Sequence, residues 1–102
     1  MPVTLVQVDF PHSGPWGAEM AAAMEGLAQS IAAEPGFLFK YWTEDQAKGL
    51  AGGVYAFASR SEAEAYLAMH SARLESFGYR NIRGLVLDVN EGLSRTDKAP
   101  VL

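Results

Sequence analysis

Two stretches in the middle of the chain are apolar on both faces of a predicted strand, and this pattern limits the possible folds more than any other. Residues 37–44 (FLFKYWTE) and 54–59 (VYAFAS) have aromatic or aliphatic side chains at odd and at even positions. An antiparallel sheet with one face in water would instead alternate apolar and polar residues. Both faces of this sheet therefore need a cover, and 102 residues make one domain with few elements to supply it.

The first half of the chain predicts a strand, a helix and a hairpin. Residues 3–10 are rich in β-branched and apolar residues, which favours a strand. A single helix is expected between Pro15 and Pro35, because apolar residues recur at positions 20, 24, 27 and 31. Residues 45–53 should form the hairpin loop, in which 51–53 (AGG) make a bend or a bulge rather than a nucleotide-binding loop.

The second half repeats the strand, helix, strand pattern. Ser61 and Glu64 have the spacing of a capping box, so a helix is predicted from there to Gly78, a natural residue for its end. Residues 81–90 read as the last strand and 91–102 as a polar tail. The order β-α-β-β-α-β in one domain over residues 1–102 predicts the α+β class and a ferredoxin-like antiparallel sheet with two helices on one face.

The uncovered face of that sheet predicts a partner. An exposed apolar face of this kind marks an interface, and a second copy of the same chain, related by a two-fold axis, would cover it. We therefore expect a homodimer that packs sheet against sheet.

Composition excludes several classes of partner and site. Eight Lys and Arg against 12 Asp and Glu give a net charge of −4, and the basic residues are dispersed, which argues against nucleic acid and anionic membranes as partners. Without cysteine there is no disulfide, thiol nucleophile or Cys-ligated metal, which fits a cytoplasmic protein. We expect neither a signal peptide nor a membrane-spanning helix. The two histidines, His12 and His70, lack the spacing of metal ligands, so no metal is expected.

His70 and Arg73 are the first candidates for chemistry. His70 lies three residues after Leu67 and four before Leu74, so it should point from the second helix toward the sheet. It could act as a general base or hydrogen-bond donor to a ligand, or be a partly buried histidine whose partner is a backbone group or a tyrosine. Arg73, one turn further, could bind an anionic substrate or pair with a carboxylate.

Lys40 and several aromatic residues are candidates for a binding pocket. Lys40 either lines a pocket or covers apolar surface with its stem while its ammonium reaches water. Trp42, Tyr55 and Tyr66 would make flat walls for an aromatic ligand, although such residues are often only core.

The remaining candidates lie at turns. Asn90 could orient a ligand oxygen or act as a turn former at the end of a strand. His12 and Trp16 could form the mouth of a pocket or pack the start of the first helix.

Four segments carry a resemblance to a known family. Residues 34–44 (EPGFLFKYWTE), 51–57 (AGGVYAF), 66–74 (YLAMHSARL) and 88–94 (DVNEGLS) resemble the YdhR-like monooxygenases. These are small members of the dimeric α+β-barrel superfamily, which also holds the antibiotic-biosynthesis monooxygenases. The resemblance covers almost the whole chain in order.

The resemblance implies a homodimer whose two sheets form a barrel, with a pocket in each subunit between sheet and helices. Cofactor-free members of the superfamily oxidise quinols or polyphenols with O₂. A base removes a phenolic proton, the anion reduces oxygen, and the peroxide collapses to a quinone. On this basis we expect a monooxygenase of small aromatic compounds without cofactor or metal.

In that reading His70 is the base, Trp42, Tyr55 and Tyr66 are the walls, and Arg73 and Asn90 make polar contacts. Two other functions stay open. One is a non-catalytic dimer that binds small molecules. The other is a haem-binding or haem-degrading relative that would use a helix histidine as ligand.

Overall fold

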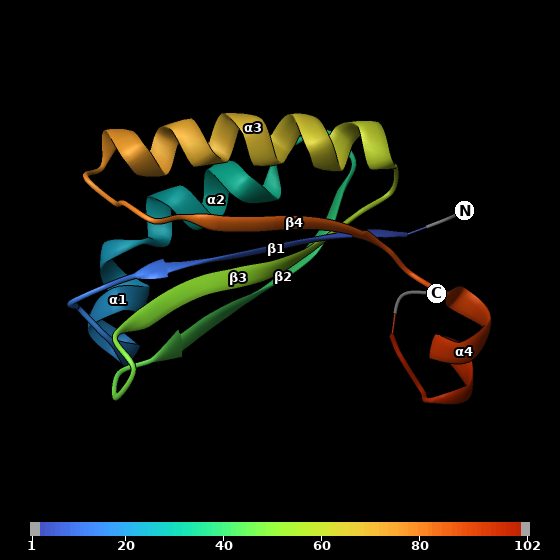
Figure 1. Cartoon of the computed structure of the whole chain (residues 1–102), viewed down its shortest axis with the longest axis horizontal. Helices are drawn as coiled ribbons and strands as arrows, with labels where there is room; N and C mark the ends of the chain where they lie inside the picture. Colours follow the sequence, from blue (N-terminus) through green and yellow to red (C-terminus); the bar gives the residue numbers. More distant parts are fainter. Residues whose placement is uncertain (1–2, 101–102) are drawn as a thin grey trace.

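A four-stranded antiparallel sheet lies under two helices in the computed structural model, which describes residues 3–100 (Figure 1). The strands lie in the order β2-β3-β1-β4. This arrangement confirms the predicted α+β class and the ferredoxin-like order of elements. The elements are β1 (Thr4–Pro11), α1 (Gly17–Ala23), α2 (Glu25–Ala32), β2 (Phe37–Asp45), β3 (Leu50–Phe57), α3 (Arg60–Ser76), β4 (Arg83–Asp88) and α4 (Glu91–Thr96).

The core lies between the sheet and the helices α2 and α3. Alternate residues of β1 are buried on this face, as the two-residue period of a strand requires, and the central strand β3 is buried at most of its positions. They meet apolar residues of the helices, and the largest fully buried side chains are Val6, Val8, Ile31, Tyr55 and Phe57. In the described part of the chain, no helix is long and apolar enough to cross a membrane.

The single helix expected between Pro15 and Pro35 is two short helices. The chain turns at Met24, where φ is −101° and ψ is 6°, outside the usual α-helical values. Two backbone hydrogen bonds still link the pieces, from the Met24 amide to the Met20 carbonyl and from the Ala28 amide to the Met24 carbonyl. Gly26 lowers helix propensity directly after the turn. The regular spacing of apolar residues therefore continues from α1 into α2, although the helix axis changes direction slightly at Met24.

The capping residue of α3 is Ser59 rather than Ser61. Its hydroxyl oxygen accepts a hydrogen bond from the Glu62 amide at 3.3 Å, and the hydroxyl donates to Glu62 Oε1 at 2.8 Å. The sequence contains two overlapping pairs with capping-box spacing, and the pair two residues earlier makes the contacts. The predicted helix is confirmed, and its start moves to Arg60.

Strand β3 begins earlier than expected, so the glycines at 52 and 53 lie within it and form no bend or bulge. Gly52 is paired with Asp9 on one side and Thr43 on the other. A Cβ atom at Gly52 would overlap the Val8 carbonyl oxygen, so this position needs glycine for the close approach of the central strands. The register shift lies in β2 instead, between Phe37 and Phe39.

The C-terminal segment contains a short helix that the expected polar tail did not include. Helix α4 begins after Asn90, whose side-chain oxygen accepts a hydrogen bond from the Leu93 amide at 3.2 Å. Glu91 accepts a hydrogen bond from the Val3 amide at 2.9 Å, which ties the helix to the start of β1. The last two residues of the predicted tail lie outside the described residues.

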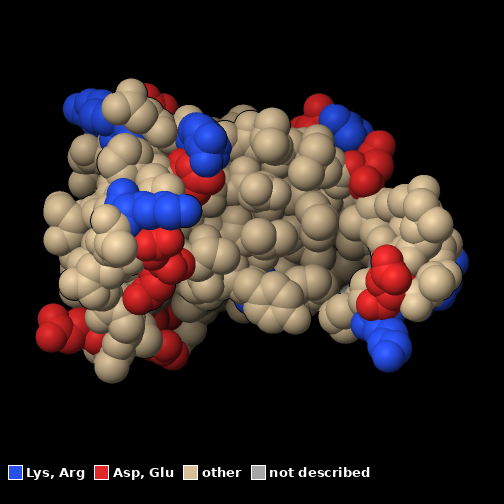
Figure 2. Space-filling model, turned by 60° about the horizontal axis from the view of Figure 1, so that its bottom comes forward, with Lys and Arg blue, Asp and Glu red and all other residues tan. Residues whose placement is uncertain are grey.

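The sheet face opposite α3 carries apolar side chains in the open. Tyr41 is 61% exposed, Leu85 55% and Leu87 42%. In Figure 2, the middle of the side away from α3 is free of charged side chains, which gather toward its edges. An ion pair lies on this face as well, since Arg83 donates two hydrogen bonds to the Asp9 carboxylate at 2.7 and 2.8 Å.

The glycine at 52 predicts a large loss of stability on substitution. We expect Gly52→Ala to lower the free energy of unfolding by about 2 kcal/mol or more, because a methyl group there forces β1 and β3 apart. Gly26→Ala is the matched control. Apart from its own turn of helix, no described residue comes within 4 Å of a Cβ there, so alanine should stabilise α2 by up to about 1 kcal/mol. Urea unfolding of both variants measures the difference, and equal midpoints would contradict the prediction.

Candidate functional site

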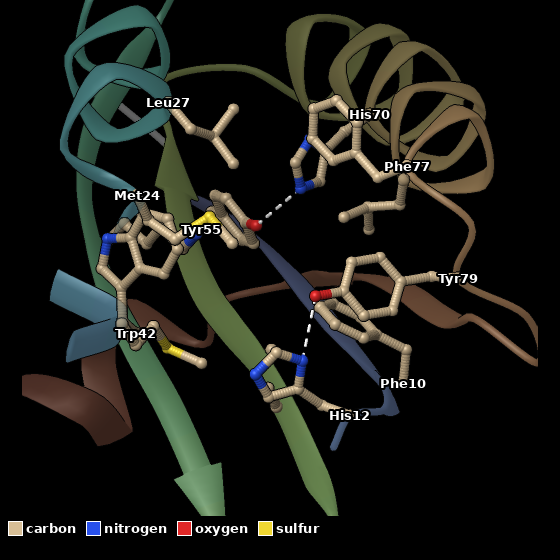
Figure 3. A pocket seen from close by; sticks show the side chains of 14 residues that line it. Phe10, His12, Met24, Leu27, Trp42, Tyr55, His70, Phe77 and Tyr79 are labelled. Atoms are coloured by element: carbon tan, nitrogen blue, oxygen red, sulfur yellow. Dashed lines mark hydrogen bonds between the residues drawn. The ribbon is translucent and has the colours of Figure 1, made fainter. Parts of the chain in front are cut away.

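A cavity lies between the sheet and the helices, where β1, β2 and β3 face α1, α2 and α3 (Figure 3). It encloses about 430 Å³ of empty space, its open mouth included. The space is narrow, because the side chains leave room for only a few water molecules between them. Most of the lining is apolar, and none of the described residues that form it is acidic. The polar side chains in the lining are His12, Lys40, Tyr55, His70 and Tyr79.

His70 is buried at one wall of the cavity and hydrogen-bonds to two side chains. Its Nδ1 accepts from Arg73, with Nη2 at 2.9 Å and Nε at 3.3 Å. A guanidinium can only donate, so Nδ1 carries no proton and the ring proton is on Nε2. That Nε2–H donates to the Tyr55 hydroxyl oxygen at 3.2 Å. The expected direction of His70 toward the sheet is confirmed, and a tyrosine is its partner there.

The surroundings of His70 keep it neutral. Burial lowers its pKa to about 3, and the positive charges of Arg73 and Lys40 act in the same direction. Burial also raises the pKa of Tyr55 far above its ordinary value, with the neighbouring Tyr66 as the next cause. At neutral pH the pair is therefore a neutral imidazole that donates to a neutral phenol.

Lys40 turns into the cavity rather than out to water. Its Nζ lies 3.1 Å from the centroid of the Trp42 ring and 4.5 Å from that of Tyr55. Burial, with the charge of Arg73 as the second cause, lowers the Lys40 pKa to about 7. An amine in this state is present in both protonation forms near neutral pH, so it can accept a proton or hold one.

Tyr66 lies behind the cavity and is not part of its lining. Its ring stacks on His70, with centroids 5.0 Å apart and planes 19° apart. Its buried hydroxyl has no hydrogen-bond partner among residues 3–100, although Tyr55 and Arg73 are close enough to influence it. Burial raises its pKa to about 12. The residue supports the histidine rather than forming a wall.

The other sequence candidates divide between the cavity and the rest of the fold. Trp42 and Tyr55 line the cavity, and Arg73 lies outside the lining, where it contacts His70. Asn90 does not line the cavity. Its side-chain oxygen is used to cap α4, so its position does not support the expected contact with a ligand.

Tyr79 and His12 form a second polar group in the lining. The His12 Nε2–H donates to the Pro15 carbonyl oxygen at 2.8 Å, and the Tyr79 hydroxyl donates to His12 Nδ1 at 2.9 Å. The sequence reading of His12 left open a pocket mouth or packing at the start of the first helix. The packing is found, since the His12 ring meets the Trp16 ring edge-on with centroids 4.8 Å apart, and His12 is a buried part of the cavity lining.

Sequence reasoning missed Tyr79, together with the apolar residues Phe10 and Phe77. Tyr79 follows Gly78, the glycine after α3, and no periodic pattern in this segment predicts which way its side chain points. Its ring packs on Phe10 at 4.3 Å between centroids. The alternation of β1 is the one signal that could have placed Phe10 on the core face.

Comparisons with known proteins agree with this fold. A solved structure of a Nitrosomonas europaea protein, described as of unknown function, matches with a TM-score of 0.61 and 16% identity over 88% of this chain and 91% of that chain. This likeness shows an α+β fold of the same kind. No curated protein matches the chain.

The family model described as "Putative mono-oxygenase ydhR" matches residues 5–100. The chain therefore belongs to the ydhR family, a monooxygenase-like family. This confirms the resemblance found in the sequence.

The buried lysine predicts a pH dependence of stability. The pKa of Lys40 is about 7 in the folded chain and 10.5 ordinarily, so between these values the unfolded chain binds more protons. The free energy of unfolding should therefore rise with pH over this range. We expect Lys40→Met to remove that rise, in urea unfolding between about pH 6 and about pH 9.5.

The exposed Lys48 on the hairpin turn is the control for this experiment. Lys48→Met should keep the pH dependence of the unmodified chain, because this side chain is in water. A Lys40→Met curve parallel to that of the unmodified chain would show that the ammonium is not desolvated.

Proposed function

We propose that this protein is a cofactor-independent monooxygenase that oxidises a small phenolic aromatic compound with O₂ in the cavity under α3. One observation carries the proposal. Lys40 and Arg73 bring positive charge to the Tyr55 and His70 pair, and within residues 3–100 no acidic side chain lines the cavity to balance it. A cationic end in an otherwise apolar cavity is suited to an aromatic anion.

The character of the cavity lining suits the phenolate form of such a compound. Its ring would lie against apolar walls that include Trp42 and Leu27, and its oxygen would lie at Tyr55. The Tyr55 hydroxyl accepts from His70 and so keeps its own proton free to donate. Membership of a monooxygenase-like family supports the same kind of reaction.

We assign the base to Lys40. Neutral amine is available near neutral pH because burial lowers the Lys40 pKa to about 7. After taking the phenolic proton, the ammonium stabilises the phenolate. The sequence suggested His70 for this step, but a pKa of about 3 and two occupied nitrogens make it a weak base. His70 instead orients Tyr55.

The reaction balances without a further reductant. The phenolate gives electrons to O₂, and a peroxide forms at the ring carbon para to the oxygen. That carbon loses its hydrogen as the O–O bond breaks. One oxygen atom becomes the new quinone carbonyl, the other leaves as water, and the phenol supplies all four electrons. The narrow apolar cavity limits water around the anion.

Haem ligation is a poorer fit to the same residues. A haem iron at His70 needs a free ring nitrogen, and both are engaged, one by Arg73 and one by Tyr55. The nitrogens of His12 are engaged as well. A binding protein without turnover would use the same cavity, and it is the outcome if no substrate consumes O₂.

We also propose that a second copy of the chain covers the open sheet face, giving a homodimer in the cytoplasm. The exposed Tyr41, Leu85 and Leu87 need an apolar partner. Asp9 and Arg83 on that face neutralise each other, so the partner need not bring charge. A second copy meets both conditions. The absence of cysteine fits a reducing compartment.

Substitution of Lys40 tests the chemistry. With a phenol that turns over, such as 1-naphthol, we expect Lys40→Met to lower kcat/KM by about 10² to 10⁴, the range for loss of a general base. The kcat/KM of the unmodified enzyme should rise with pH through about 7 as Lys40 loses its proton. Oxygen uptake measures both. Labelled ¹⁸O₂ should place one labelled atom in the quinone and the other in water.

Two further variants distinguish the role of Lys40 as the base from the role of His70 in orienting Tyr55. Lys40→Arg keeps the charge but cannot accept a proton, so it should bind the phenol and not turn it over. His70→Ala should cost only about 10- to 100-fold, the effect of one hydrogen bond that serves a charged group. Hydrogen peroxide as the product, or unchanged turnover in Lys40→Arg, would show that the mechanism is wrong.

The dimer has a separate test. A carboxylate in the apolar middle of the open face should prevent packing, so Leu85→Glu is expected to be monomeric in light scattering after size exclusion. Leu93→Glu changes an exposed leucine on α4 and should leave the dimer intact. A monomeric unmodified chain would rule out the proposed assembly.

A further inference from the structure

We propose that Tyr79, held by His12, selects ligands that carry a hydrogen-bond donor in addition to the phenolate oxygen. The ligand class is then an aromatic compound with a second hydroxyl group or an amino group. Tyr55 and Tyr79 both bring their hydroxyl groups to the cavity, and each is hydrogen-bonded to a histidine (Figure 3). The two hydroxyls differ in what they can still offer a ligand.

The hydrogen bonds of His12 fix the direction of the Tyr79 proton. The Pro15 carbonyl oxygen can only accept, so the His12 ring proton lies on Nε2 and points to it at 2.8 Å. His12 Nδ1 is then an acceptor, and the Tyr79 hydroxyl donates to it at 2.9 Å. The proton of Tyr79 is therefore engaged, and its oxygen offers only lone pairs to the cavity.

The hydrogen bonds of His70 produce the opposite result at Tyr55. Arg73 can only donate, which leaves the ring proton on Nε2 and makes Tyr55 the acceptor. Among the described residues, the Tyr66 hydroxyl has no partner at hydrogen-bond geometry, so it does not hold the Tyr55 proton. Tyr55 thus offers a donor and Tyr79 an acceptor.

The Tyr79 oxygen affects which ligand binds because its surroundings are apolar. Phe10 packs on the Tyr79 ring, and Phe77 lines the cavity beside them. A ligand that displaces water from the Tyr79 oxygen without giving it a hydrogen leaves it unsatisfied, which is unfavourable. A ligand with O–H or N–H at that position replaces the lost bond. The inference rests on the proposed function only for which oxygen of the ligand is the phenolate.

A panel of naphthols tests the preference in the absence of O₂. The donors are 1,5-dihydroxynaphthalene and 5-amino-1-naphthol, 5-methoxy-1-naphthol is acceptor-only, and 1-naphthol is the unsubstituted reference. Quenching of Trp42 fluorescence at about pH 8 in a Trp16→Phe background reports binding at the cavity wall. We expect both donors to bind about three- to tenfold tighter than the methoxy compound.

Two substitutions separate selection from structural support. Tyr79→Phe should bring the ratio close to one, mainly by weakening the donors. His12→Leu frees the Tyr79 proton, so the preference should move toward the methoxy compound. A purely structural role would weaken all four ligands alike. Tyr66→Phe is the control and should leave the ratio unchanged.

The outcomes distinguish this inference from the proposed function. An unchanged ratio in Tyr79→Phe, or no preference in the unmodified chain, overturns the inference even if O₂ uptake is found. Donor selection without O₂ uptake for any phenol overturns the proposed function and leaves the inference in place. If none of the four compounds binds, both are overturned.

Discussion

The hydrogen bond from Arg73 to His70 Nδ1 determines what the cavity can do. A guanidinium always donates, so it fixes the imidazole proton on Nε2, and that proton in turn makes Tyr55 an acceptor. The Tyr55 proton stays available as a result. The same cation lowers the pKa of His70 and of Lys40, so the arginine affects three side chains of the site without lining the cavity. Replacing it would change proton positions as well as charge.

The register shift in β2 explains why Lys40 lies where this cation acts on it. In an unbroken strand, Phe37, Phe39 and Tyr41 share one face and Lys40 and Trp42 the other. The shift between Phe37 and Phe39 reverses the faces beyond it. Phe37 therefore packs on the core while Lys40 and Trp42 also face the helices and line the cavity.

This irregularity shows how far the sequence alone could predict the site. The element order and the inward direction of His70 follow from local patterns of two or 3.6 residues, which the chain keeps almost throughout, whereas the family follows from the resemblance of four segments. The bulge, the two-part helix and the position of Tyr79 depend on contacts between distant segments, so no local pattern reveals them. The sequence could not decide whether Lys40 lines a pocket or reaches water, because the register shift in β2 determines which face of the sheet Lys40 is on.

The alternation of β1 keeps acidic charge out of the cavity. Asp9 stands between Val8 and Phe10, whose side chains face the helices, so its carboxylate faces the other side and binds Arg83. A slip of one residue in β1 would turn Asp9 toward Lys40. A carboxylate there would hold the lysine as ammonium and occupy the place of a phenolate. In a chain with net charge −4, strand register therefore decides that the cavity stays cationic and open to an anion.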